Sequence, residues 1–215
     1  VRMTERSPRI PWPGRPPCGG VGRRSPKAYD APPEKYGTPP LWAREANFAT
    51  LIHIILEQQV SLASARSAFN KLKEKLEAIT PEKVLGLDDA EMKACYFSRQ
   101  KTLYARDLSK AIVDGKLNLE NLQSLSDEEV KEELKQIKGI GDWTAQCYLL
   151  MALLRVDVMP RGDIALHAAY QKLKDLPKRP NSDEFIKLAE KWSPYRAVAA
   201  RLLWHFYLSE RKTKS

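Results

Sequence analysis

The residues best placed to do chemistry are an aspartate and an indole that lies well before it in the chain. Asp163 closes the loop Pro160-Arg-Gly-Asp163, directly before an apolar segment typical of a helix, and Trp143 follows the turn Ile137-Lys-Gly-Ile-Gly141. A carboxylate can stabilise a developing cation and orient or deprotonate a water molecule. An indole can stack on a cationic ring. Because Asp is also favoured at helix N-caps, the alternative for Asp163 is a purely structural cap.

The glycine-containing turn before Trp143 has the features of an anion-binding hairpin. The capping box Ser126-Asp-Glu-Glu129 opens a segment with helical apolar spacing, and the stretch after the turn, WTAQCYLLMALL, is apolar on most sides. The pattern therefore predicts two helices joined by a glycine turn. A helix that begins at glycines presents unpaired amide N–H groups and a positive dipole end, which together suit a phosphate.

Composition is compatible with a polyanionic partner but does not prove one. The 215 residues include 36 Lys and Arg against 27 Asp and Glu, for a net charge of +9 and an isoelectric point near 9.4. No apolar run reaches the about 18 residues of a membrane span, and no secretory signal is recognisable. Cys18, Cys95 and Cys147 lie far apart, which argues against a disulfide scaffold, a zinc ribbon and an iron–sulfur cluster. We expect an intracellular, reducing setting.

The chain divides into an arm and a helical domain. Residues 1–40 hold ten of the fifteen prolines, so we expect a flexible Pro/Gly/Arg-rich arm. Residues 41–215 carry helical spacing almost throughout and no convincing alternation at period two, which predicts an all-α fold. The expected helices span about residues 45–56, 61–76, 88–95, 98–113 and 182–191, with further helices after Thr80, Ser126, Gly141, Asp163 and Pro194.

Four motifs, taken together and in order, resemble the helix-hairpin-helix (HhH-GPD) DNA glycosylase superfamily, and within it the alkylpurine branch, 3-methyladenine DNA glycosylase II. They are the hairpin with its Pro160-Arg-Gly-Asp163, and Ile55-Leu-Glu-Gln-Gln-Val-Ser61, Ser98-Arg-Gln-Lys101 and Trp192-Ser-Pro-Tyr-Arg196 leading to Trp204. The resemblance covers about residues 41–210. It implies a two-lobed helical fold with the hairpin and an active-site cleft between the lobes.

The resemblance also implies a reaction. The expected enzyme is a monomer that flips alkylated purines of the 3-methyladenine and 7-methylguanine class out of double-stranded DNA. It then hydrolyses the N-glycosidic bond and leaves an abasic site for base excision repair. Asp163 would be the catalytic carboxylate. The lyase-competent branch carries a lysine where this chain has Trp143, so a monofunctional enzyme is expected.

Further site residues follow from the same resemblance. The base pocket would be lined by Trp143, Trp204 and Cys147. DNA would be contacted by Gln59, which fills the gap left by the flipped base while Gln58 holds the loop, by Arg99 and Lys101 on the backbone, and by the amides of Gly139 and Gly141 on a phosphate. No cofactor is required, although a structural Na⁺ or K⁺ would bind the backbone carbonyls of Lys135, Ile137 and Ile140.

Structural alternatives stand beside these roles. Large aromatic residues usually pack in cores, paired glutamines often end surface helices, and charged helix faces are usually solvated. His167 is interpreted as a core or surface histidine, and Tyr195 and Arg196 as braces for the fold. Two other functions stay open: a non-catalytic DNA-structure-binding protein that uses the same hairpin, and a bifunctional glycosylase/AP lyase. An Asp163 that faces an aromatic-lined cleft beside the hairpin, and does not pair with a lysine or arginine, would favour the glycosylase.

Overall fold

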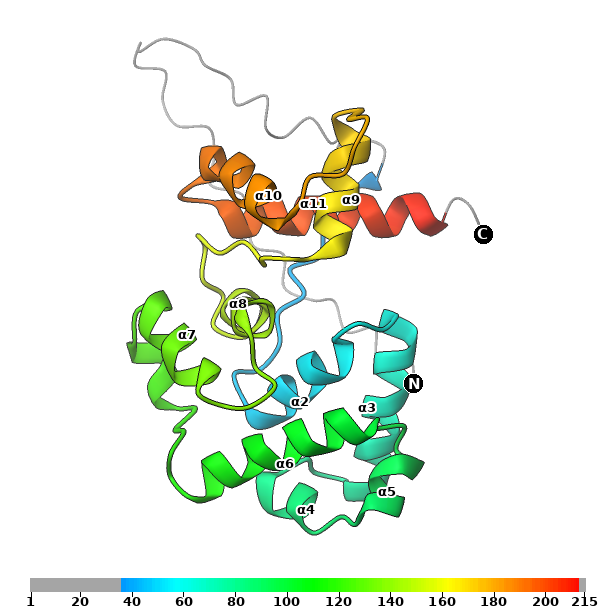
Figure 1. The fold of residues 1–215 in the computed structure, drawn as a ribbon, viewed down its shortest axis with the longest axis vertical. Helices are drawn as coiled ribbons and strands as arrows, with labels where there is room; N and C mark the ends of the chain where they lie inside the picture. The colour runs from blue at the N-terminus through cyan, green and yellow to red at the C-terminus, as the bar shows by residue number, and fades with distance from the viewer. Residues whose placement is uncertain (1–35, 213–215) are drawn as a thin grey trace, which may run out of the picture.

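The computed structural model describes residues 36–212, and within that range all regular structure is helical, as predicted. The arm predicted for residues 1–40 lies almost entirely outside this range. In Figure 1, α9, α10 and α11 form an upper lobe, α2 to α7 form a lower lobe, and α8 lies between them. The helices are α2 (Phe48–Glu57), α3 (Leu62–Leu76), α4 (Pro81–Leu85), α5 (Asp89–Ala94), α6 (Arg99–Val113), α7 (Asp127–Lys135), α8 (Asp142–Met151), α9 (Ile164–Leu173), α10 (Ser182–Ala189) and α11 (Arg196–Lys212).

Side-chain caps set most helix starts. The side chains of Ser61, Ser98 and Ser126 each accept a backbone N–H from the first turn that follows, which confirms the predicted starts. The first helix begins three residues later than expected, at Phe48. The reason is local, because the Asn47 side chain accepts the amide of Thr50 at 3.0 Å and makes Asn47 the cap. None of the described helices is long and apolar enough to cross a bilayer.

Helix α2 is the centre of the lower lobe. Its residues Leu51, Ile52, Ile54 and Ile55 are fully buried, and the helix packs on α3, α6 and α8. A helix that is apolar on nearly all sides must be covered all round. Packing against these neighbours therefore fixes the position of the end of α2. It also fixes the point at which the following loop starts.

Helix α11 organises the upper lobe and also contacts α8 and the segment before α2. The chain before α2 lies along it, with the ring of Tyr36 edge-on to Phe206 at a centroid distance of 6.0 Å. The buried guanidinium of Arg201 donates to the carbonyl of Leu41 at 2.8 Å and to that of Leu150, in α8, at 2.6 Å. Among the described residues, Tyr36 already contacts α11, although it precedes the predicted boundary at residue 41.

An ion pair braces the loop between α8 and α9. The Nε and Nη2 atoms of Arg196 donate to the two carboxylate oxygens of Asp157 at 2.7 and 2.9 Å, and Ser193 donates to the same carboxylate at 2.9 Å. The bracing role expected for Arg196 is confirmed. The hydrogen bonds from Arg196 hold the pKa of Asp157 below its usual value, against an opposing effect of burial.

The pKa of Asp157 leads to a prediction for Asp157→Asn. A carboxyl whose pKa is lower in the folded state stabilises the fold above its unfolded pKa of about 3.9, and that contribution is lost as the pH falls through the folded pKa. The variant should therefore unfold at a lower urea concentration than the wild type at pH 7, and the difference should shrink below about pH 4. Asp107→Asn is the control, because Asp107 makes no ion pair within residues 36–212. Equal unfolding midpoints for Asp157→Asn and the wild type at pH 7 would contradict the bracing role.

Candidate active site

Asp163 is held by hydrogen bonds from two helices. It is the N-cap of α9, where its Oδ1 accepts the amide of Leu166 at 2.9 Å. Its Oδ2 accepts the indole N–H of Trp143, on α8, at 3.0 Å. The side chain is 8% exposed, and within residues 36–212 it pairs with no lysine or arginine. Asp163 is thus a helix cap and also a carboxylate oriented by an aromatic residue. The interpretation as a structural cap and the interpretation as a catalytic carboxylate are therefore compatible.

Cys147 is a buried residue on the same helix as Trp143. It lies one turn after Trp143 on α8 and is 1% exposed. Burial raises the pKa of the Cys147 thiol well above its usual value, and the negative charges of Asp163 and Glu57 add to the effect. Cys147 is therefore a neutral thiol within the electrostatic field of Asp163. Its side chain is covered in the free protein.

Trp204 lies in a different environment from Trp143. It is 9% exposed on α11, and its ring meets that of Trp42 edge-on at a centroid distance of 6.3 Å. No ring contact joins Trp204 to Trp143 in the part of the chain that the structure describes. The structure thus brings Trp143 to Asp163, buries Cys147 on the same helix, and packs Trp204 against the segment before α2.

His167 is a core residue of the upper lobe, as the sequence suggested. Its buried ring packs on Phe185 at a centroid distance of 4.6 Å. Burial lowers the pKa of His167, while the nearby carboxylate of Asp163 has the opposite effect. The imidazole is therefore neutral at pH 7, and it adds no positive charge beside Asp163.

The two glycines of the hairpin serve different purposes. Gly139 has a φ of +91°, and a Cβ at this position would lie 2.1 Å from Cγ of Tyr104. Gly141 is the N-cap of α8, and a Cβ there would meet nothing within 4 Å. Within residues 36–212 neither glycine amide donates a hydrogen bond. The backbone conformation and the contact with Tyr104 thus explain why position 139 is glycine. Neither reason applies to Gly141, which has open space around it and a free N–H at the N-terminus of α8.

The carbonyls expected to bind a cation fit that role chemically. The carbonyl of Ile137 accepts the amide of Ile140 at 3.0 Å. The carbonyls of Lys135 and Ile140 accept no hydrogen bond from the described residues. Free backbone carbonyls at a turn are suitable ligands for an alkali ion. No group of three or more His, Cys, Asp or Glu side chains that could hold a metal occurs within residues 36–212.

The loop between α2 and α3 is tied to the hairpin. The side-chain amide of Gln58 donates to the carbonyl of Gly139 at 2.8 Å and to the hydroxyl of Thr144 at 2.9 Å. The next residue, Gln59, is exposed and has a φ of +56°. This arrangement agrees with the interpretation that Gln58 holds the loop and that Gln59 is free to contact a ligand.

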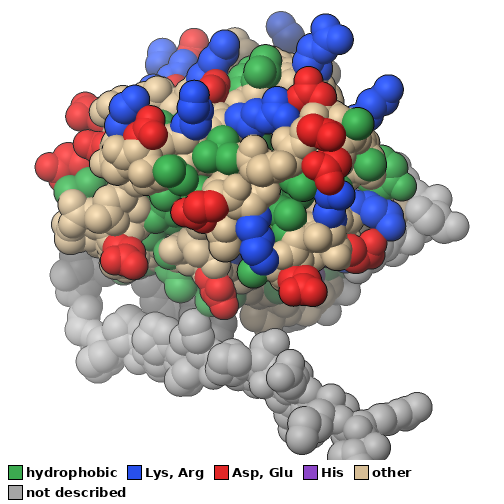
Figure 2. Space-filling model, turned by 90° about the horizontal axis from the view of Figure 1, so that it is seen from below, with side chains coloured by type: hydrophobic (Ala, Val, Ile, Leu, Met, Phe, Trp, Pro, Cys, Tyr) green, Lys and Arg blue, Asp and Glu red, His purple; other side chains and the backbone are tan. Residues whose placement is uncertain are grey.

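The two basic residues of the Ser98-Arg-Gln-Lys101 motif differ in their surroundings. Arg99 is exposed and makes no ion pair within the described residues. Lys101 is partly buried, and its ammonium donates to the carbonyl of Leu56 at 2.6 Å. Figure 2 shows basic and acidic side chains interspersed over the lower face of the molecule, so that face is not a broad positive patch.

Sequence reasoning missed two residues that support the site. Tyr104 packs against Gly139, and Thr144 accepts a hydrogen bond from Gln58. Tyr104 stands one turn after Lys101, so helical spacing would have placed it on the same face of α6. Nothing local marks Thr144, because its partner lies far away in the chain.

The known proteins that this chain resembles are base excision DNA repair proteins. The family model described as "HhH-GPD superfamily base excision DNA repair protein" matches residues 52–194. DNA-3-methyladenine glycosylase 1 of Schizosaccharomyces pombe is 35% identical over 161 residues, which cover 73% of this chain and 71% of that protein. The putative DNA-3-methyladenine glycosylase YfjP of Bacillus subtilis is 30% identical; the match covers 80% of this chain but only 62% of that protein.

A solved structure resembles the fold as well as the sequence. The 3-methyladenine DNA glycosylase Mag1 of Schizosaccharomyces pombe, in complex with abasic DNA, superposes with a TM-score of 0.69 at 35% identity. The match covers 73% of this chain and 78% of that one.

The two glycines give a matched pair of variants. Gly139→Ala should destabilise the protein by about 3 kcal/mol, because a positive φ and the overlap with Tyr104 each cost about 1–2 kcal/mol. In a domain of this size that lowers the melting temperature by about 6–12 °C. Gly141→Ala should cost no more than about 1 kcal/mol, the usual loss at an N-cap. Thermal unfolding followed by circular dichroism measures both, and similar losses in the two variants would contradict the assignment.

Proposed function

Because the chain belongs to the HhH-GPD superfamily of base excision DNA repair proteins, we propose that it is a monofunctional DNA glycosylase that excises alkylated purines from double-stranded DNA. The substrates would be of the 3-methyladenine and 7-methylguanine class, and the product an abasic site. The hydrogen bond between Trp143 and Asp163 carries the proposal most directly. It joins an aromatic ring to a buried carboxylate that no described cation neutralises.

The chemistry follows from the charge of the substrate. An alkylated purine already carries a positive charge, so it takes the electron pair of the C1′–N bond and leaves as a neutral base without a strong general acid. The sugar becomes oxocarbenium-like, as in glycoside hydrolysis generally. The Asp163 carboxylate stabilises this cation, and water attacks C1′ and loses its proton to Asp163 or solvent.

Trp143 accounts for the reaction type. A lyase needs an amine that attacks the sugar to form a Schiff base, and the family position for that amine carries Trp143 in this chain. An indole face also attracts a cationic, electron-poor ring. Trp143 would therefore stack on the flipped base while its N–H orients Asp163. The pocket role expected for Cys147 and Trp204 is not part of the proposal, because the Cys147 side chain is covered and Trp204 packs against Trp42.

The hairpin and the α2–α3 loop would hold the DNA. The free amides of Gly139 and Gly141 suit a phosphate beside the lesion. An alkali ion on the carbonyls of Lys135, Ile137 and Ile140 would add positive charge near that phosphate. Gln59 would enter the gap left by the flipped base, and Arg99 would contact the DNA backbone.

Asp163→Asn separates this proposal from a non-catalytic DNA-binding role. Asn is as good a helix cap as Asp, so the variant should fold and bind DNA normally. Release of methylated bases should fall by about 10²-fold or more, because the charge that stabilises the transition state is lost. The measurement is chromatography of bases released from methylated DNA. Wild-type rates in Asp163→Asn would exclude the mechanism, and a covalent adduct trapped by borohydride would favour the bifunctional alternative.

Trp143→Phe tests the orienting hydrogen bond. The variant keeps an aromatic ring but loses the N–H donor to Asp163. A hydrogen bond to a charged group contributes about 1.5–3 kcal/mol, so single-turnover base release should fall by about 10–100-fold. Binding to lesion-containing DNA should change by less than about threefold, because the stacking surface remains.

Trp192→Phe is the matched control for this substitution. Trp192 is buried in the upper lobe, and its indole N–H has no partner within residues 36–212. Removing the indole N–H of Trp192 in this variant should leave the rate of base release unchanged. Equal rates in Trp143→Phe and Trp192→Phe would show that the hydrogen bond to Asp163 does not matter for catalysis.

A further inference from the structure

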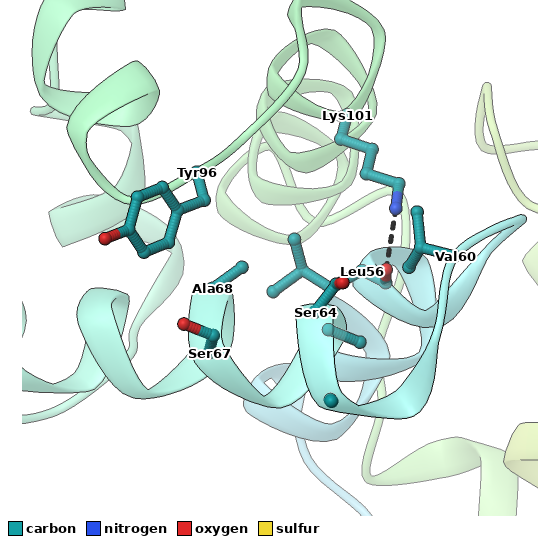
Figure 3. Close-up of a pocket in the computed structure, with 9 residues that line it drawn as sticks. Leu56, Val60, Ser64, Ser67, Ala68, Tyr96 and Lys101 are labelled. Atoms are coloured by element: carbon teal, nitrogen blue, oxygen red, sulfur yellow. Dashed lines mark hydrogen bonds between the residues drawn. The ribbon is translucent and has the colours of Figure 1, made fainter.

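A cavity of about 440 Å³ lies beside the α2–α3 loop, between α3 and the start of α6. Figure 3 shows the Lys101 side chain directed from α6 to the carbonyl of Leu56 on one side of the cavity, with Tyr96 on the opposite side. The lining includes Leu56, Val60, Ser64, Ala68, Tyr96 and Lys101. The ammonium of Lys101 is thus directed into the protein, where its partner is a main-chain oxygen.

The Leu56 carbonyl lies in the last turn of α2. Carbonyls in a final helical turn lack intrahelical partners, and a cation is favourable there because it opposes the helix dipole. Helix α2 has no basic residue in its own last turn. Lys101 supplies this charge from α6, and burial lowers the pKa of its ammonium, as expected for a charge withdrawn from solvent.

The same face of α6 also supports the hairpin. Tyr104 stands one turn after Lys101, and its ring lies against Gly139. Gln58 joins the end of α2 to the carbonyl of Gly139 at 2.8 Å. The end of α2, the hairpin and α6 are therefore connected pairwise, and this closed set of contacts fixes the separation between the α2–α3 loop and the hairpin.

We propose that Lys101 is a positioning residue, which holds the α2–α3 loop, and with it Gln59, at a set distance from the hairpin instead of neutralising a DNA phosphate. The proposal rests on the proposed function, since it concerns how the loop enters DNA. It divides the Ser98-Arg-Gln-Lys101 motif into two roles. Arg99, exposed at the start of α6, is left as the phosphate contact.

Salt dependence distinguishes the two roles. Each phosphate that a protein neutralises contributes about 0.9 to the slope of the logarithm of affinity against the logarithm of salt concentration. Arg99→Met should therefore reduce that slope by about 0.9. Lys101→Met should leave the slope unchanged and alter affinity for undamaged duplex by less than about threefold, because no phosphate contact is lost.

Loop insertion is measured separately, with a duplex that contains a stable abasic-site analogue opposite 2-aminopurine. Entry of Gln59 beside 2-aminopurine changes its stacking and its fluorescence. Lys101→Met should lose most of the fluorescence change and about tenfold or more of the base-release rate, the scale expected when a catalytic geometry is displaced. Lys101→Arg keeps a cationic donor for the Leu56 carbonyl and should recover both signals.

The outcomes separate the alternatives. A slope reduced by about 0.9 in Lys101→Met would show a phosphate contact and overturn the proposal. Unchanged fluorescence and base release in that variant would overturn it as well. If Lys101→Met does not fold, Lys101→Gln takes its place in the same comparison. Wild-type protein that releases no methylated base would refute the proposed function, whereas the salt slopes and the fluorescence report on positioning without any bond cleavage.

Discussion

The hydrogen bond from the Trp143 indole to Asp163 is the constraint on which the candidate site depends. It joins the helix that begins at the hairpin to the helix that Asp163 caps. A phosphate seated on the hairpin amides would therefore sit at a set distance from the carboxylate, because α8 connects the two. The N-cap bond to Leu166 holds the second carboxylate oxygen, so the group cannot turn freely. Orientation of this kind lowers the cost of reorganisation in the transition state.

The lower lobe supports this arrangement from the other side. Helix α2 is buried almost completely, so its end, and the loop that follows, are placed by packing and not by the loop itself. Gln58 and Lys101 then secure that end to the hairpin and to α6. A residue that must enter a DNA helix benefits from such support, because a loop ordered in advance loses less entropy on binding.

The fold was largely predictable because helix boundaries are local. A capping residue and the backbone N–H that donates to it lie within one turn of each other, so the helix starts at Ser98 and Ser126 could be predicted directly. Chemically similar residues were harder to separate. Sequence reasoning assigned Gly139 and Gly141 one role and Arg99 and Lys101 another. The structure distinguishes the members of each pair, because Tyr104 covers only Gly139 and the Leu56 carbonyl engages only Lys101.

The sequence by itself determined the all-α class, the hairpin, and the presence of Asp163 and Trp143, and the resemblance to the glycosylase family implied that Trp143 stands where a lyase would carry an amine. These features depend on residue type and on spacing along the chain. Only the tertiary structure decided that the indole donates to Asp163, that Trp204 packs against Trp42, and that Lys101 is directed inward. The physical reason is that burial and hydrogen-bond partners arise from residues far apart in sequence, which meet only when the helices pack.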